Sequence, residues 1–398
     1  MNKKSLSSLL SASVLLSDGS MGALLSSMGY PTPCPDELAV TQPGVILDIH
    51  RAYLDAGADI LIADTFGSTE PVLSHKGRAG QGERFTRAAV LLAKEAAGDK
   101  ALVALDMGPT GEFMHPVGKW SFEDVFSWFY AQAAIGKEAG ADFAFIETQT
   151  DLAEARAACL AARKAGLEAI VSFSVNEKGR TLTGASLEAC AVSVQAAGAA
   201  AFGFNCSVGP DELTACVERA RKITCLPIAV QPNAGLPVTH PDGSVTYPFG
   251  PERMLSGMQR IADAGAGLIG GCCGTTPEHI RLMKPLTQRT PPAAIEQKQY
   301  LSSARECFDA LSALECPETI SDPEDAYDAD EDTTILTVSD EEFTCEQILE
   351  LASYTKLPLC IEGHDEEKTE ALLRVYPGRA AVKGCPKAAA AYGALLAE

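Results

Sequence analysis

The chain has 398 residues, of which 46% are hydrophobic and 21% are charged, and its formal net charge is −21. This apolar fraction is ordinary for a globular protein, so the composition excludes a disordered, collagenous or coiled-coil chain. Residues 301–398 carry most of the charge, with 22 acidic against 7 basic side chains. An acidic surface repels nucleic acid and anionic membranes, so we expect neither as a partner.

The N-terminal segment shares features with a signal peptide, because two lysines precede the apolar run LSSLLSASVLL. Serines interrupt this run and Asp18 follows it, which argues against export. No stretch approaches about 18 uncharged apolar residues, so no membrane span is expected. The 13 cysteines are too irregularly spaced for a disulfide framework. We interpret them as reduced thiols of a cytoplasmic protein, some of them free to bind metal.

Short apolar runs alternate with longer amphipathic stretches from the N-terminus to about residue 285, which predicts repeated βα units. Gly57, Gly140, Gly198 and Gly265 each follow a helical pattern and are expected to end it in the left-handed conformation. The expected strands cover residues 13–18, 59–66, 101–106, 142–147, 168–175, 200–206, 226–231 and 267–273.

Eight βα units in this length predict an α/β fold, a (β/α)8 TIM barrel over residues 1–288. A doubly wound open sheet is the alternative, but no GxGxxG motif follows the first strand. Active sites of such barrels form at the carboxyl ends of the strands. The polar residues expected there are Asp18, Asp64, Asp106, Glu147, Ser174, Cys206, Asn233, Cys272 and Cys273.

The strongest local motif is GGCCGTTPEHI at residues 270–280. Its glycines leave the backbone free to bend, so that Cys272 and Cys273 can converge with Cys206, which ends the sixth strand. Three thiolates with an open fourth position are typical of catalytic zinc, and soft sulfur ligands favour zinc over magnesium or calcium. A vicinal disulfide is the alternative, but it would be strained and would need an oxidising compartment.

A zinc site with three thiolates is anionic and therefore activates water poorly. It is better suited to binding a substrate thiol as its thiolate, because coordination lowers the pKa of a thiol below its free value of about 8.5. The expected chemistry is attack by that sulfur on an electrophilic carbon.

Eight motifs resemble the homocysteine S-methyltransferase family, in the family's order over residues 12–288: DGSMGALL, TFGST, MGPTGE, FIETQTDLAEA, GRTLTGAS, GFNCSVGPDEL, QPNAGLP and GGCCGTTPEHI. QPNAGLP and GRTLTGAS are more similar to the homocysteine-binding domain of cobalamin-dependent methionine synthase than to the betaine-type enzymes. The resemblance implies a methyltransferase in which homocysteine binds one zinc ion through its thiolate, accepts a methyl group and leaves as methionine.

The resemblance also implies roles for individual residues, with the same three cysteines as zinc ligands. Asp18 and Glu147 would bind the substrate ammonium, and the amides of Gly19 and Ser20 would receive its carboxylate. Asp18 as a turn residue and Glu147 as a helix-capping partner are the alternatives. Asn233 is expected to place its amide oxygen near the metal in the absence of substrate, although Asn before Ala-Gly is also ordinary turn chemistry.

Two residues depart from the family pattern. Asp64 stands where Asn more usually precedes TFG, and Asp106 occupies a position that is often Ser or neutral. These extra carboxylates would make the site more negative or bind a cation, and they would suit a thiol that carries a second positive group.

The segment after the barrel is interpreted as an acidic linker at residues 289–332 and a small α/β module of three strand–helix units at residues 333–398. The module resembles a truncated remnant of a pterin-binding domain, but Glu362 and Lys383-Gly384 replace the expected Asp and Asn-Ser. No DxHxxG motif is present either. We therefore expect no folate or corrinoid site in this chain. The last expectation concerns His279, which is predicted at the surface in the first turn of a helix.

Three functions remain open at this stage. The leading one is methyl transfer to homocysteine from a corrinoid held by a separate carrier protein. The second uses a small donor such as S-methylmethionine or betaine, or another thiol as acceptor. The third is a non-catalytic zinc-binding subunit whose acidic C-terminal module binds a partner.

Overall fold

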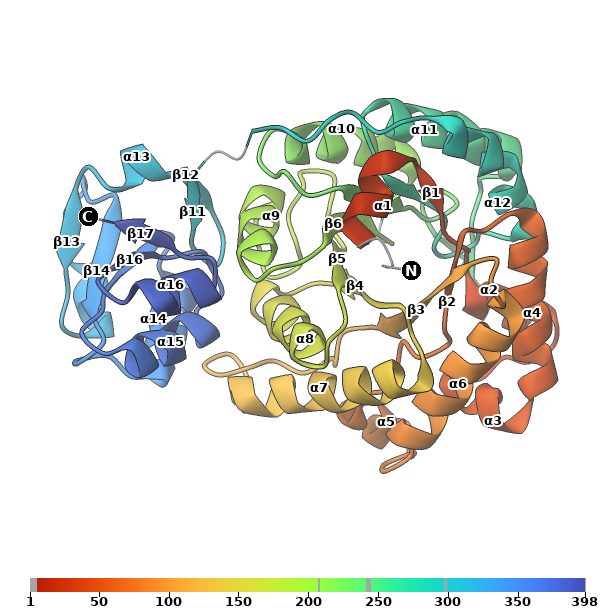
Figure 1. The fold of residues 1–398 in the computed structure, drawn as a ribbon, viewed down its shortest axis with the longest axis horizontal. Helices are drawn as coiled ribbons and strands as arrows, with labels where there is room; N and C mark the ends of the chain where they lie inside the picture. The colour runs from red at the N-terminus through yellow and green to blue at the C-terminus, as the bar shows by residue number, and fades with distance from the viewer. Residues whose placement is uncertain (1–5, 207, 241–244, 297–298, 398) are drawn as a thin grey trace.

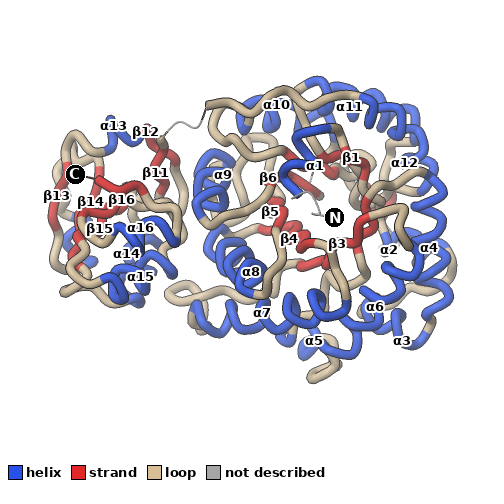
Figure 2. The backbone as a smooth tube through the Cα atoms, viewed as in Figure 1, coloured by secondary structure: helices blue, strands red, loops and turns tan. Residues whose placement is uncertain are grey.

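A computed structural model describes residues 6–206, 208–240, 245–296 and 299–397. Eight parallel strands form a ring that a layer of helices surrounds (Figure 1 and Figure 2). A bridge between Ser17 and Ile60 joins the two edge strands and closes the ring. The predicted TIM barrel is therefore confirmed, and the open sheet is rejected. The strands pair in the order β1 (Leu15–Leu16), β10 (Leu268–Ile269), β7 (Ile228–Gln231), β6 (Ala201–Asn205), β5 (Ala169–Phe173), β4 (Phe143–Gln149), β3 (Leu102–Met107) and β2 (Ile60–Ile62).

Helices of the outer layer pack their apolar faces against the strands, because each carries apolar residues three and four positions apart. Gly57, Gly140, Gly198 and Gly265 have φ between 82° and 108° at the helix ends, as predicted. The helices of the barrel region are α2 (Met21–Ser27), α3 (Leu38–Thr41), α4 (Pro43–Ala56), α5 (Glu70–His75), α6 (Gly82–Ala97), α7 (Phe122–Ala139), α8 (Leu152–Lys164), α9 (Leu187–Ala196), α10 (Pro210–Ala220), α11 (Pro251–Asp263) and α12 (Pro277–Met283), with short 3-10 helices η1 (Pro35–Glu37) and η2 (Lys284–Gln288).

The apolar run near the N-terminus is part of the fold. It forms α1 (Leu6–Ala12), whose Leu6 and Leu10 are buried in a cluster with Ile60 and Phe143 at the amino end of the barrel. Residues 1–5, where the two lysines lie, are outside the described residues. Among the described helices, none has the length and apolar character that a membrane crossing requires.

A second, five-stranded parallel sheet lies beside the barrel (Figure 1), as expected for a C-terminal α/β module. Its strands, in spatial order, are β13 (Pro317–Thr319), β14 (Ile335–Ser339), β15 (Leu359–Glu362), β16 (Ala381–Lys383) and β17 (Leu395–Ala397). Its main helices are α14 (Cys345–Tyr354), α15 (Glu366–Val375) and α16 (Pro386–Ala391).

Two secondary-structure expectations for this region are wrong. The last residues form β17 rather than the end of a helix, because α16 stops at Ala391 and Leu395–Ala397 pair with β16. The segment interpreted as a linker contains β13, which pairs with β14 in spite of its acidic surroundings. It also contains the antiparallel pair β11 (Tyr300–Ser302) and β12 (Cys307–Asp309), the helix α13 (Ala310–Ala313) and the 3-10 helix η3 (Pro323–Tyr327). The division of the chain into domains stays a prediction.

The expected position of His279 is also wrong, since only 5% of this residue is exposed. Its Nε2 donates to the Phe249 carbonyl at 3.0 Å, and its Nδ1 accepts from the Thr276 amide at 3.2 Å. The loop before α11 therefore covers the start of α12, and His279 connects the two.

Candidate thiol-lined active site

A cavity of about 310 Å³ opens at the carboxyl ends of the strands. Predicted site residues from several strands line it together: Gly19, Ser20, Asp64, Asp106, Glu147, Cys206, Cys272 and Cys273. Residues that the sequence did not single out also line it, among them Asp36, Phe66, Lys76 and Gln231. Asp18 and Asn233 lie behind this wall, where they are buried.

The three predicted cysteines converge, with their sulfur atoms all within 4.8 Å of one another. Cys206 follows β6 with a φ of 58°, which turns the chain sharply where the strand ends. The amide of Cys272 donates to the Pro232 carbonyl at 2.9 Å, and the amide of Cys273 donates to Oδ1 of Asn233 at 3.1 Å. The loops after β7 and β10 are thereby joined, and together they hold the cysteine pair toward Cys206.

The two glycines before the cysteine pair are required by close packing. A Cβ atom on Gly270 would lie 1.9 Å from Oγ of Ser17, and one on Gly271 would lie 2.4 Å from Oγ1 of Thr275. Any side chain at either position would therefore push β1 away from β10 or displace the cysteine loop. The close approach of these loops explains why the motif reads GGCC.

The donor set fits a zinc ion. Three sulfur atoms at this separation can each approach one ion at the usual Zn–S distance of about 2.3 Å. Hydrogen bonds from Cys206 and Cys272 lower the pKa of Cys273, and hydrogen bonds in the same cluster raise that of Cys272, so the thiols share their protons as a group. The described cysteines are all free thiols, so Cys272 and Cys273 do not form the alternative vicinal disulfide in this structure.

The two carboxylates that the sequence predicted for ammonium binding lie beside the thiols, since Asp18 follows β1, the neighbour of β10, and Glu147 lies close to Cys206. Oδ2 of Asp18 accepts from the Ile62 amide at 2.8 Å, whereas its Oδ1 is buried without a partner among the described residues. Burial raises the pKa of Asp18 well above its usual value. Desolvation, with the nearby Cys206 thiol, raises the pKa of Glu147 to about 7. Both carboxyl groups thus lack the positive partner that would stabilise their charged forms.

Asn205 is a site residue that the sequence analysis missed. Its Nδ2 donates to Oε2 of Glu147. The same Nδ2 donates to Oγ1 of Thr148, and its Oδ1 accepts from the Thr148 amide and the Ser172 hydroxyl, these three at 2.8 Å. Asn205, at the end of β6, thus reaches across the end of β5 and fixes the orientation of the Glu147 carboxylate on β4. Its position directly before Cys206 is the sequence feature that could have indicated a role in the site.

Ser20 and Asn233 hold loops together in this structure. The Ser20 amide donates to Oγ1 of Thr275 at 3.2 Å, and its hydroxyl caps α2. Oδ1 of Asn233 accepts from Cys273, as described above. Ser20 is also held by Tyr53, whose hydroxyl donates to the Ser20 carbonyl at 3.0 Å. Neither Thr275 nor Tyr53 was predicted as a site residue, because both lie far from Ser20 in the chain.

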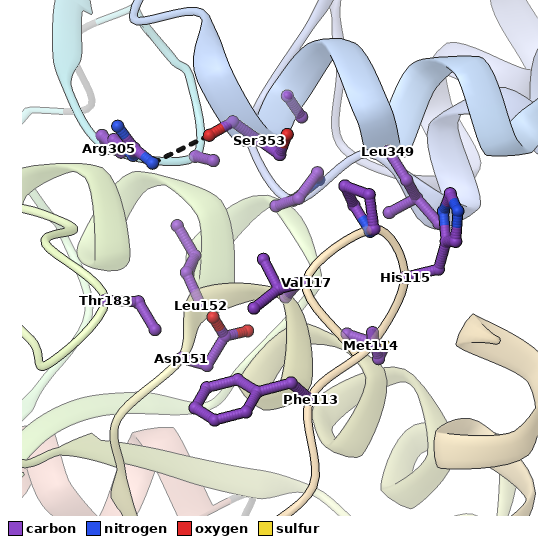
Figure 3. Close-up of a pocket in the computed structure, with 15 residues that line it drawn as sticks. Phe113, Met114, His115, Val117, Asp151, Leu152, Thr183, Arg305, Leu349 and Ser353 are labelled. Atoms are coloured by element: carbon purple, nitrogen blue, oxygen red, sulfur yellow. Dashed lines mark hydrogen bonds between the residues drawn. The ribbon is translucent and has the colours of Figure 1, made fainter. Parts of the chain in front are cut away.

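A second cavity, of about 280 Å³, lies between the barrel and the C-terminal module (Figure 3). Phe113 and Val117 from the loop after β3 face it, and Leu349 from α14 lines its opposite side. Arg305 closes one end, where it donates to the Ser353 carbonyl at 2.8 Å. None of its lining residues belongs to the thiol-lined cavity, so the two are separate.

The fold and the site together define a class of protein. It is a TIM barrel whose mouth combines three convergent thiols with buried carboxylates, which suits it to binding an amino acid that carries a thiol. Residues 15–286 match the family model described as homocysteine S-methyltransferase. The chain therefore belongs to the homocysteine S-methyltransferase family, a family of methyltransferases, as its motifs predicted.

The chain is similar to two curated proteins, both named methionine synthase. The one from Mycobacterium leprae is 30% identical over 332 residues, which cover 77% of this chain and 27% of that protein. The one from Mycobacterium tuberculosis is 32% identical over 293 residues, covering 68% and 24%. The chain thus spans about a quarter of the length of these relatives. Among solved structures, the metallated homocysteine methyltransferase MmuM of Escherichia coli shares the barrel fold, with a TM-score of 0.59 and 24% identity over 68% of this chain and 96% of that one.

Proposed function

We propose that this chain transfers a methyl group to the thiol of homocysteine and so produces methionine. The observation that carries the proposal is the convergence of Cys206, Cys272 and Cys273 in the same cavity as Glu147. Family membership supports homocysteine as the acceptor.

The chain's own residues supply binding and orientation. Cys206, Cys272 and Cys273 would hold one zinc ion, which when bound lowers the pKa of a coordinating thiol and makes it a nucleophile at neutral pH. Asp18 and Glu147 would pair with the substrate ammonium, whose positive charge compensates their burial. Fixing the amino acid at this end orients its thiol toward the three sulfurs. Thiolate ligands require a reducing compartment, which supports a cytoplasmic location.

The donor we propose is methylcobalamin on a separate corrinoid carrier protein. Large apolar side chains are exposed in the loops around the mouth of the barrel, which supports docking of a macromolecule there. Methionine synthase relatives that are about four times longer than the matched segment also support a donor outside this chain. The exposed apolar residues of these loops are Phe66, Leu182, Leu236, Val238 and Val245.

Zinc-edge X-ray absorption on the purified chain, with and without homocysteine, tests the proposed acceptor chemistry. We expect three sulfur ligands and one light atom without substrate, and four sulfur ligands with it. A chain without zinc, or a metal site that homocysteine leaves unchanged, would contradict the mechanism and favour the non-catalytic zinc-binding subunit or another thiol.

Product formation separates the possible donors. The proposal expects methionine from a methylcobalamin-loaded carrier and none from S-methylmethionine or betaine. Methionine from either small donor at a comparable rate would show that the chain needs no corrinoid partner.

A further inference from the structure

Carboxylates follow four neighbouring strands of the barrel, which makes one half of its mouth acidic. Asp18, Asp64, Asp106 and Glu147 lie at the ends of β1, β2, β3 and β4, whereas the three thiols lie at the ends of β6 and β10. A homocysteine molecule carries one ammonium group, which the proposed function assigns to Asp18 and Glu147. Asp106 shares a hydrogen bond with Glu147, but neither Asp64 nor the remaining oxygen of Asp106 receives a positive partner from the substrate.

Both remaining carboxylates are buried and have a free oxygen. Asp64 is 7% exposed and Asp106 is 6% exposed, and both line the thiol-lined cavity. Oδ2 of Asp64 and Oδ1 of Asp106 have no hydrogen-bond partner among the described residues. A buried carboxylate with an unpaired oxygen is costly unless a ligand completes it.

The nearest cation, Lys76, compensates this charge only in part, because it lowers the pKa of Asp64 less than burial and Asp36 raise it. Lys76 lines the same cavity, but its Nζ lies 3.6 Å from Oδ2 of Asp36. The Asp36 carboxylate also accepts hydrogen bonds from the Gly67 amide at 3.0 Å and the Ser68 hydroxyl at 2.8 Å. Lys76 is thus paired with Asp36, and its charge offsets only part of the burial cost of Asp64.

Hydrogen bonds join the two strand ends that carry these carboxylates. Oγ1 of Thr65 donates to the Asp106 carbonyl at 2.8 Å and accepts from the Asp106 amide at 3.0 Å. Nε2 of Gln132 donates to the carbonyls of Thr65 and Asp106, at 2.7 and 3.0 Å. These four bonds join the ends of β2 and β3. On the cavity side the Phe66 ring packs on Gly108, where a Cβ would lie only 2.6 Å from it.

From this arrangement we infer that Asp64 and Asp106 form a second cation-binding subsite, which takes a small group with a single positive charge. Carboxylate oxygens are hard ligands that favour alkali or ammonium ions over soft metals. A divalent ion would need more ligands. Among the described residues, only the three cysteines form a group of three or more His, Cys, Asp or Glu side chains whose ligand atoms lie within 4.8 Å of one another. Burial, together with the nearby Asp36, raises the pKa of Asp64 to about 8; an empty subsite therefore holds protons, which a bound cation replaces.

The cation can come from two sources that share this chemistry. One is a free potassium or ammonium ion. The other is a second amino group on the ligand that occupies the pocket. The inference concerns binding alone, so it can fail while methyl transfer to homocysteine holds, and the reverse is equally possible.

Isothermal titration calorimetry on the zinc-loaded chain tests the subsite. Thallium(I), a heavy stand-in for potassium, is titrated in a buffer without alkali ions, and 1,3-diaminopropane is compared with propylamine. If the source is a free ion, one thallium ion binds per chain and potassium displaces it. If the source is a ligand amine, the diamine binds at least about tenfold more tightly than the monoamine, because a second charge pair forms.

Site-directed variants connect either signal to the two residues. Asp64→Asn and Asp106→Asn keep the size of the side chain, and each should weaken the observed binding by at least about tenfold. Asp48→Asn, which removes one charge from the exposed face of α4, should leave it unchanged. Zinc content and melting temperature show that the variants fold. Equal binding by the Asn variants and the parent chain, or no binding of either probe, would overturn the inference.

Discussion

His50 is a buried residue that the chemistry of the site does not use. It is fully buried in α4, and neither ring nitrogen has a hydrogen-bond partner among the described residues. Desolvation lowers its pKa to about 4, against an ordinary value of 6.5. His50 therefore stays neutral in the folded chain at a pH where it is protonated in the unfolded chain.

This difference predicts a loss of stability in acid. Between pH 6.5 and pH 4 the unfolded chain binds a proton at His50 that the folded chain does not, so stability falls as the pH falls through that window. At pH 5 the loss amounts to about 2 kcal/mol relative to pH 7. His50→Leu should remove this share of the loss, measured by urea unfolding at both pH values. An unchanged acid sensitivity in His50→Leu, or the same benefit from His240→Leu at an exposed histidine, would contradict the assignment.

A second prediction concerns Asn205, which orients Glu147. Asn205→Ala removes the donors to Glu147 and Thr148, so the KM for homocysteine should rise by roughly tenfold, as expected for the loss of a hydrogen bond to a charged group. Zinc content should not change, because Asn205 offers no ligand to the sulfur cluster. Steady-state kinetics and metal analysis check both statements. Asn176→Ala, in the loop after β5 and outside the cavity, is the control; an equal effect there would show a general loss of loop structure.

At the scale of elements, the position of the site depends on how closely β1 approaches β10. The Gly270 position leaves no room for a Cβ beside Ser17, and two-residue strands such as these offer few backbone hydrogen bonds to resist displacement. The GGCC motif is therefore as much a packing requirement of barrel closure as a source of thiols.

Gly270→Ala should destabilise the chain by about 1–3 kcal/mol through overpacking. It should also reduce zinc content, because the displaced strand carries the cysteine pair with it. Gly44→Ala is the matched control, since a Cβ there meets no atom within 4 Å and α4 gains a better helix former. Urea unfolding and metal analysis of the two variants decide the question: similar stabilities would show that the Gly270 backbone adapts easily.

At the scale of the whole molecule, buried polar contacts connect the barrel to the C-terminal module. Arg156 of α8 is fully buried; its Nη1 donates to the Arg374 carbonyl at 2.7 Å, and its guanidinium lies 5.8 Å from the Tyr392 ring centre. Nε of Arg374 lies 2.9 Å from Oε1 of Glu123 on α7. Helix α8 also contributes Leu152 to the lining of the cavity in Figure 3.

Arg156→Ala should loosen the module specifically. It leaves the Arg374 carbonyl without its donor, at a cost of about 1–3 kcal/mol. Hydrogen exchange should accelerate in α15 and in β16, while the barrel strands keep their protection. Arg163→Ala is the control, because Arg163 also lies on α8 but donates to Ala197 within the barrel. Faster exchange in α15 for both variants would show that α8 as a whole, and not the buried guanidinium, holds the module.

Local patterns in the sequence determined a large part of this protein. The alternation of short apolar runs with amphipathic stretches predicted all eight barrel strands, because period-two and period-3.6 patterns depend only on neighbouring residues. Glycines such as Gly57 ended helices as expected, since few other residues tolerate that conformation. The motif around Cys272 and Cys273 was sufficient to indicate the family.

Tertiary structure alone decided which residues meet. Whether Cys206 reaches the cysteine pair, and whether Asn205 reaches Glu147 some 58 residues away, depends on barrel closure and loop packing, which local patterns do not encode. His279 was wrongly predicted at the surface for the same reason, because the loop before α11 buries it. The acidic strand β13 was missed because its partner β14, and not its own composition, makes it a strand. The sequence thus specified the elements and the reactive groups, and the long-range contacts of the closed barrel specified their neighbours.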